Sequence, residues 1–238
     1  MDWTTYDAAL FDLDGVLTPT ADVHMRAWER MFSDYLDARG DSAAPYVESD
    51  YFDYIDGKPR CDGVRAFLAS RDITLPEGTP EDAPTQETVC GLGNRKNEAF
   101  NEVLAAEGVT AYPGSLALLD ALGATGMKMA VVSSSKNAPA VLAAAGIADR
   151  FGVVVDGAVA AAQGLPGKPA PDTFWRAAEV LGVPNERCVV LEDAHSGIQA
   201  GAAGGFGLVV GVDRGAGADA LRASGADTVV DDLAELLP

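Results

Sequence analysis

Asp12 and Asp14 stand one residue apart where an apolar segment ends, in the stretch FDLDG. Alternation along an extended chain turns both side chains to the same side. Because two carboxylates held so close repel each other, the pair requires a cation between them or a proton on one of them. A hard cation such as Mg²⁺ would meet this requirement with oxygen ligands. A tight turn is the alternative, since Asp-Gly is a common turn former.

Three later stretches place further polar groups where an apolar run ends or a helix is about to begin. Ser133 closes the run AVVS and suits phosphate oxygens, although it could also cap the next helix. Lys168 lies in the loop LPGKPAPD, where it could hold an anion or be an ordinary surface lysine. Glu192 and Asp193 end the run VVLED, and they could complete a metal site or cap a helix.

A parallel sheet would bring these groups together. From Met129 onward, apolar runs that look buried on both faces alternate with alanine-rich helical stretches, and the opening AALFDLD has the same buried character. This alternation indicates an α/β fold with helices on both faces of the sheet. Such sheets bind ligands at the carboxyl ends of their strands, which is where the polar residues described above are expected to lie. The expected strands are AALFDLD, MAVVS, FGVVV, CVVLE, GLVVGV and DTVV.

The region from residue 20 to residue 108 has a different pattern, with no comparable apolar strand. Met25, Trp28 and Phe32 follow helical spacing, and residues 94–106 form a second helical pattern. Residues 73–93 are rich in proline, glycine and acids, and we expect a long loop there. The sequence therefore predicts an all-helical domain inserted after the first strand. The expected boundaries are 1–19 and 109–238 for the sheet domain and 20–108 for the helical domain.

Composition excludes several classes of partner. The chain has 17 basic and 36 acidic residues, a net charge of −19, which disfavours nucleic acid and anionic membranes as partners. The three cysteines are odd in number and widely spaced, without a CxxC pair, which fits a reducing compartment. The first residues are acidic where a signal peptide needs bases, and no apolar run reaches the ~18 residues of a membrane span. We expect a cytoplasmic monomer.

The order of the four stretches is more specific than any one of them, and it resembles that of the haloacid dehalogenase-like superfamily along essentially the whole chain. The resemblance implies a Rossmann-like three-layer core with a helical cap. It also implies that Asp12 attacks phosphorus, that Asp14 is the general acid/base, and that Ser133 and Lys168 hold the transferring phosphoryl group. The implied Mg²⁺ ligands are Asp12, the backbone carbonyl of Asp14, Glu192 and Asp193.

Within the superfamily, the helical insertion is most similar to that of the β-phosphoglucomutase family. The resemblance implies that Thr20 and His24 orient the acid/base aspartate at a hinge, and that Arg60 grips a second phosphate. The remaining substrate contacts that it implies are Lys96, Ser135 and Asn137. The implied partner is a hexose phosphate, with β-D-glucose 1-phosphate and glucose 6-phosphate interconverted through an aspartyl phosphate and glucose 1,6-bisphosphate.

The sequence is compatible with other functions and with other roles for several of these residues. A sugar-phosphate or small-metabolite phosphatase would use the same core, with water taking the phosphoryl group. A catalytically silent sugar-phosphate-binding protein is a third possibility, which the intact set of Asp12, Asp14, Ser133, Lys168 and Asp193 disfavours. His24 could be a buried structural histidine, while Arg60 and Lys96 could be partners of surrounding acids. Pro19 departs from the family pattern, which commonly has an acidic residue between the two hinge threonines.

Overall fold

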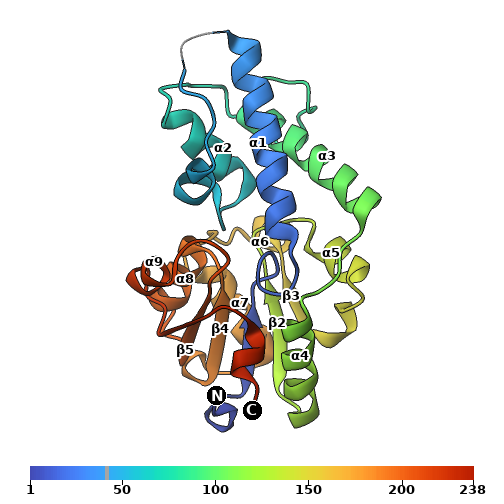
Figure 1. The fold of residues 1–238 in the computed structure, drawn as a ribbon, viewed down its shortest axis with the longest axis vertical. Helices are drawn as coiled ribbons and strands as arrows, with labels where there is room; N and C mark the ends of the chain where they lie inside the picture. Colours follow the sequence, from blue (N-terminus) through green and yellow to red (C-terminus); the bar gives the residue numbers. More distant parts are fainter. Residues whose placement is uncertain (41–42) are drawn as a thin grey trace. The chain divides into compact units, whose positions relative to one another are not determined.

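A six-stranded parallel sheet organises the larger part of the computed structural model, which describes residues 1–40 and 43–238. The chain divides into two units. The core unit comprises Met1–Thr20 and Val109–Pro238, and the helical unit comprises Ala21–Gly108. Figure 1 shows the strands in the core unit and the helices α2 and α3 in the helical unit.

All neighbouring strands of the sheet run parallel, in the order β3-β2-β1-β4-β5-β6. β1 lies at the centre and pairs with β2 on one side and β4 on the other. The predicted α/β class is therefore confirmed. The strands are β1 (Ala8–Phe11), β2 (Lys128–Val132), β3 (Val153–Val155), β4 (Cys188–Glu192), β5 (Leu208–Val212) and β6 (Thr228–Val230).

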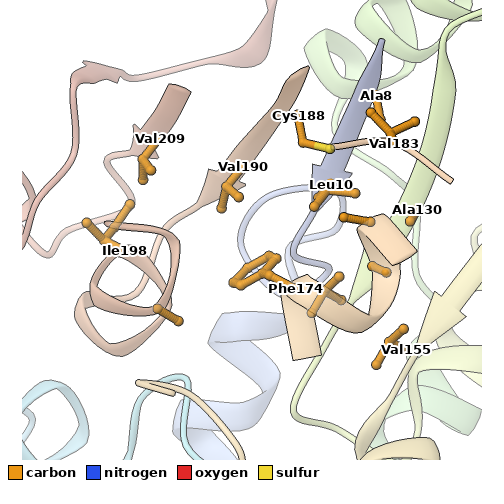
Figure 2. Close-up of a cluster of buried hydrophobic side chains, with 14 of the residues drawn as sticks. Ala8, Leu10, Ala130, Val155, Phe174, Val183, Cys188, Val190, Ile198 and Val209 are labelled. Carbon is orange, nitrogen blue, oxygen red and sulfur yellow. The ribbon is translucent and has the colours of Figure 1, made fainter. Parts of the chain in front are cut away.

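Both faces of the sheet are buried. On one face, Leu10 of β1 and Val190 of β4 join Phe174 and Ile198 in a single apolar cluster (Figure 2). Residues of opposite parity, such as Ala9 and Phe11, are fully buried as well. Strands enclosed on both faces read as continuous apolar runs, which is why the sequence pattern identified them. The core-unit helices are α4 (Pro113–Thr125), α5 (Ala138–Ala144), α6 (Gly157–Gln163), α7 (Asp172–Leu181), α8 (His195–Ala203) and α9 (Ala218–Ala223), with short 3₁₀ turns at Trp3–Thr5, Ala148–Arg150, Asn185–Arg187 and Leu233–Leu236.

The helical unit has its own apolar cluster, in which aromatic rings stack among aliphatic side chains. Phe32 of α1 stacks on Phe67 of α2 with ring centroids 3.7 Å apart, and Trp28 stacks on Phe32 at 5.3 Å. The helices are α1 (Thr20–Arg39), α2 (Arg60–Ala69) and α3 (Val89–Glu107), with a π-helical turn at Tyr51–Ile55. Among the residues described, no helix combines the length and the apolar character needed to cross a membrane.

The prediction of a loop over residues 73–93 is wrong at its end, because α3 already begins at Val89. The Thr88 side chain accepts a hydrogen bond from the Gly91 amide at 2.9 Å and so caps the helix. A side chain at Gly91 would lie 2.3 Å from the Gln86 carbonyl oxygen. The glycines that suggested a loop therefore allow close packing at a helix start.

Candidate active site

Asp12, Lys168 and Glu192 form a buried ionic cluster at the carboxyl ends of β1 and β4. Asp12 directly follows β1, and its amide donates to the carbonyl of Leu191 at 2.9 Å. The Lys168 Nζ donates to Asp12 Oδ1 and to Glu192 Oε1, both at 2.5 Å. It also donates to the Val132 carbonyl at 3.0 Å. Because the side chains of all three charged residues are at most 9% exposed, their interactions are little screened by water.

Burial raises the pKa of Asp12 well above its ordinary value, and the carboxylates of Glu192 and Asp14 add to this rise, while Lys168 opposes it. Burial alone would lower the pKa of Lys168, but the carboxylates of Asp12 and Glu192 outweigh it and raise that pKa. Lys168 therefore stays protonated. Its burial excludes the alternative that it is an ordinary surface lysine. Because burial is the main cause of the rise at Asp12, its charged form would be favoured by additional positive charge at the site.

A third acid completes a potential metal site. Carboxylate oxygens of Asp12, Glu192 and Asp193 lie within 4.8 Å of one another, and all three residues are buried. Gly15 approaches this group closely, with φ at +85°, and a side chain there would lie 1.8 Å from an Asp193 oxygen. Three carboxylates against one ammonium leave negative charge that a divalent cation could neutralise, and carboxylate oxygens suit a hard cation. The cluster therefore fits a metal ion.

The carboxylate of Asp14 is held by a hydroxyl group of the segment that follows it. The Thr20 hydroxyl donates to Asp14 Oδ1, and the hydroxyl groups of Thr18 and Thr20 lie 2.8 Å apart. Both threonines are fully buried, whereas Asp14 is partly exposed. The sequence marked Thr18 only as the hinge threonine before Pro19 and gave it no contact, although a second hydroxyl two residues from Thr20 was a visible signal.

Ser133, Ser135 and Asn137 line a turn that follows β2. The Ser133 hydroxyl accepts from the Ser135 amide at 3.1 Å, and the Ser135 hydroxyl accepts from the Asn137 amide at 3.1 Å. Since α5 begins at Ala138 with Asn137 as its N-cap, Ser133 does not cap that helix. The turn therefore presents two hydroxyl groups beside Val132, whose carbonyl binds Lys168.

His24 and Lys96 lie together in the helical unit. The Lys96 Nζ contacts His24 Nδ1, and it lies 5.0 Å from the Trp28 ring centroid and 5.1 Å from that of Phe100. The His24 ring stacks on Phe100 with centroids 4.1 Å apart. Lys96 is only 3% exposed, so aromatic faces supply part of its stabilisation in place of water. The aromatic partners were recognisable from the sequence spacing, since Trp28 stands four residues after His24 and Phe100 stands four residues after Lys96.

Arg60 is the first residue of α2 and lies against α3. A side chain at Gly93 would come within 3.1 Å of Arg60 Cγ, so the arginine stem passes directly over that glycine. Burial lowers the pKa of Arg60, although it stays a cation. Within residues 1–40 and 43–238, no carboxylate forms an ion pair with Arg60. The guanidinium group is therefore available for an anion from outside the chain.

Arg214, which sequence reasoning missed, anchors the loop between the two aspartates and α1. Its Nε donates to the Gly15 carbonyl at 2.8 Å, and its Nη1 donates to the Asp231 carbonyl at 2.9 Å. Its guanidinium group also lies 4.1 Å from the centroid of the Tyr112 ring. A basic residue just after a strand, in VDRG, was the only signal in the sequence.

Comparisons with known proteins show which family the chain resembles. The profile of the haloacid dehalogenase-like hydrolase family matches residues 6–205. A β-phosphoglucomutase of Mycobacterium bovis is 51% identical over 239 residues, covering 97% of this chain and 91% of that protein. Hexitol phosphatase A of Escherichia coli is 32% identical over 230 residues, covering 95% and 91%. The crystal structure of β-phosphoglucomutase from Clostridium difficile has a TM-score of 0.77 and 26% identity, covering 97% of this chain and 93% of that one.

The profile match, the identity to the mycobacterial relative and the site at the carboxyl edge of the sheet lead to one assignment. The chain belongs to the haloacid dehalogenase-like hydrolase family, among its β-phosphoglucomutase-like members.

Proposed function

We propose that this protein is a β-phosphoglucomutase, which interconverts β-D-glucose 1-phosphate and glucose 6-phosphate through glucose 1,6-bisphosphate. The observation that carries the proposal is the half-buried Arg60 guanidinium without a carboxylate partner among the residues described. A bisphosphate intermediate needs a second phosphate grip in addition to the reaction centre, and a guanidinium group suits phosphate. The 51% identity to the Mycobacterium bovis enzyme supports the same activity.

Asp12 would act as the nucleophile and Asp14 as the proton carrier. The Asp12 carboxylate would attack phosphorus and become an aspartyl phosphate, while the sugar oxygen leaves with a proton from Asp14. In the second half-reaction, Asp14 would take the proton from the attacking sugar hydroxyl. The buried Thr20 hydroxyl donates a hydrogen bond to Asp14 Oδ1 and so restricts the orientation of the Asp14 carboxyl group.

Lys168 and Ser133 would hold the transferring phosphoryl group. The Lys168 ammonium group already lies 2.5 Å from the Asp12 oxygen, so it can reach phosphoryl oxygens bound to that carboxylate. Its positive charge would offset the charge that develops in the transition state. The Ser133 hydroxyl, in the turn after β2, would donate to another oxygen of the same group.

Asp12, Glu192, Asp193 and the backbone carbonyl of Asp14 would hold a Mg²⁺ ion. When bound, the ion would neutralise the carboxylates and let a dianionic phosphate approach them. Mg²⁺ is favoured over softer metals because every proposed ligand is an oxygen atom.

We propose the two-domain division expected from the sequence, with a core domain at 1–19 and 109–238 and a cap domain at 20–108. The cap would exclude water while the bisphosphate reorients between the two half-reactions, since water would otherwise hydrolyse the aspartyl phosphate. His24 and Lys96 would contact the substrate from the cap, and Ser135 and Asn137 from the core. The protein would act on a hexose phosphate as a cytoplasmic monomer.

A phosphatase acting on a sugar or sugar-alcohol phosphate is the second candidate. The observation that favours it is the 32% identity to hexitol phosphatase A over nearly the whole chain. The two activities differ in what attacks the aspartyl phosphate, a sugar hydroxyl or water. The lone guanidinium of Arg60 favours the mutase, because hydrolysis of a monophosphate needs only one phosphate grip.

The two candidates are separated by one assay. The protein is given Mg²⁺, β-D-glucose 1-phosphate and a trace of glucose 1,6-bisphosphate, and glucose 6-phosphate and free phosphate are followed separately. The mutase proposal predicts that glucose 6-phosphate is the main product. Release of free phosphate as the main product would favour the phosphatase, and hexitol phosphates would then be tested as substrates. The Asp12→Asn variant should form neither product.

A further inference from the structure

Two cysteines that are distant in the sequence meet in the helical unit. The Sγ atoms of Cys61 and Cys90 lie 3.4 Å apart, with one thiol able to donate to the other. Cys61 is the second residue of α2 and Cys90 the second residue of α3, so both thiols lie at helix starts. Cys61 is half-buried and Cys90 is buried. The pair forms a dithiol with one member open to solvent.

We propose that Cys61 and Cys90 form a reversible oxidative modification site, at which a low-molecular-weight disulfide converts the two thiols into an intramolecular disulfide that displaces Arg60. The site itself stands on the geometry of the two thiols. Its effect on activity rests on the proposed function, in which Arg60 grips the second phosphate. Nothing in the proposed phosphoryl transfer uses either thiol.

The exchange proceeds in two balanced steps. The Cys61 thiolate attacks one sulfur of the reagent disulfide, forms a mixed disulfide and expels the first reagent thiolate. Cys90 then loses its proton and attacks the Cys61 sulfur, expelling the second reagent thiolate, which takes up a proton. Two protein thiols are oxidised while one reagent disulfide is reduced to two thiols. Cys61 is the entry point because it is more exposed and because burial raises the pKa of Cys90 to about 12.

Closing the bond requires a local movement. A disulfide holds its sulfur atoms about 2.05 Å apart, so the two Sγ atoms must approach each other by about 1.4 Å. The start of α3 is held by the Thr88 cap and by the close approach of Gly91 to the Gln86 carbonyl. The start of α2 lacks a side-chain cap, since its N-cap residue, Pro59, makes no capping hydrogen bond. The first turn of α2 is therefore the part that shifts.

Arg60 would move with that turn. It precedes Cys61 directly, and its stem lies over Gly93, which is one turn along α3 from Cys90. The contacts Cys61–Cys90 and Arg60–Gly93 are thus adjacent between the same two helices. Drawing the first pair together changes the position of the guanidinium group relative to α3. Loss of a charge-assisted phosphate contact should lower mutase turnover by about tenfold or more.

The test uses the full chain in a Cys188→Ala background, in which Cys61 and Cys90 are the only thiols. Oxidised glutathione is the probe. We expect loss of both titratable thiols, a monomer lighter by two hydrogen atoms, and a cross-linked peptide that contains both cysteines. Mutase turnover should fall about tenfold or more and return with dithiothreitol. When treated with oxidised glutathione, the Cys61→Ser variant should neither form the cross-link nor lose mutase turnover. Cys90→Ala is a second variant with the same expected result, for the case that Cys61→Ser folds poorly.

Two results would overturn the inference. One is that only mixed disulfides or intermolecular dimers form while the protein remains folded. The other is that the intramolecular bond forms but changes neither turnover nor the labelling of Arg60 by an arginine-selective dicarbonyl reagent. The labelling experiment does not depend on the substrate. If the reduced protein lacks mutase activity, the proposed function fails, while cross-linking and labelling still decide whether the dithiol site exists.

Discussion

Replacing Lys168 with methionine tests the charge balance at the centre of the site. Lys168 makes two ion pairs of 2.5 Å with the carboxylates of Asp12 and Glu192, and its side chain is 1% exposed. Lys168→Met keeps much of the volume but leaves two buried carboxylates without their cation. Breaking a buried pair in this way costs about 3–5 kcal/mol of the free energy of unfolding. For a chain of this length, such a loss lowers Tm by about 6–20 °C.

The assay is urea and thermal unfolding of the metal-free protein in the presence of a chelator. The exposed Lys136, replaced by methionine, is the matched control and should change the free energy of unfolding by less than about 0.5 kcal/mol. The double variant Asp12→Asn/Lys168→Met should recover part of the loss, because it removes one of the stranded charges. A loss below about 1 kcal/mol for Lys168→Met, with no recovery in the double variant, would refute the reasoning.

The remaining predictions concern Arg60, Arg214 and Asp12. Arg60→Ala should reduce mutase turnover about 10–100-fold but leave hydrolysis of a small aryl phosphate nearly unchanged, and equal losses would remove the case for a second phosphate grip. Arg214→Met should lower the free energy of unfolding by about 1–3 kcal/mol in urea titrations, because two backbone carbonyls lose a charged donor, and an unchanged value would contradict the anchoring role. The pKa of Asp12 is raised above the usual range of an aspartate, and Mg²⁺ affinity should weaken as the pH falls through that raised pKa. The reason is that a proton and the metal ion compete for the same carboxylate. Calorimetry that finds the same affinity across that range would contradict this assignment.

The sequence predicted the sheet and the core of the site because buried parallel strands leave a simple pattern. Each run apolar on both faces became a strand, and the polar residue at its end came to the same edge of the sheet. Asp12 and Glu192 end two strands that are neighbours in the sheet, which brings their side chains to the same lysine.

Contacts between distant segments could not be predicted in the same way. Arg214 binds a backbone carbonyl 199 residues away, and a carbonyl leaves no mark in the sequence. Cys61 and Cys90 are 29 residues apart and meet only because α2 packs on α3. The start of α3 was missed because Gly91 and Gly93 have low helix propensity, whereas the Thr88 cap and close packing favour the helix there.

The ratio of glucose 6-phosphate formed to phosphate released tests the central claim most directly. Both products can be followed by ³¹P NMR in one sample that contains the protein, Mg²⁺, β-D-glucose 1-phosphate and a trace of glucose 1,6-bisphosphate. A mutase that uses Asp12 predicts that glucose 6-phosphate greatly exceeds free phosphate, and that Asp12→Asn forms neither. Free phosphate as the main product, or undiminished turnover in Asp12→Asn, would contradict the account.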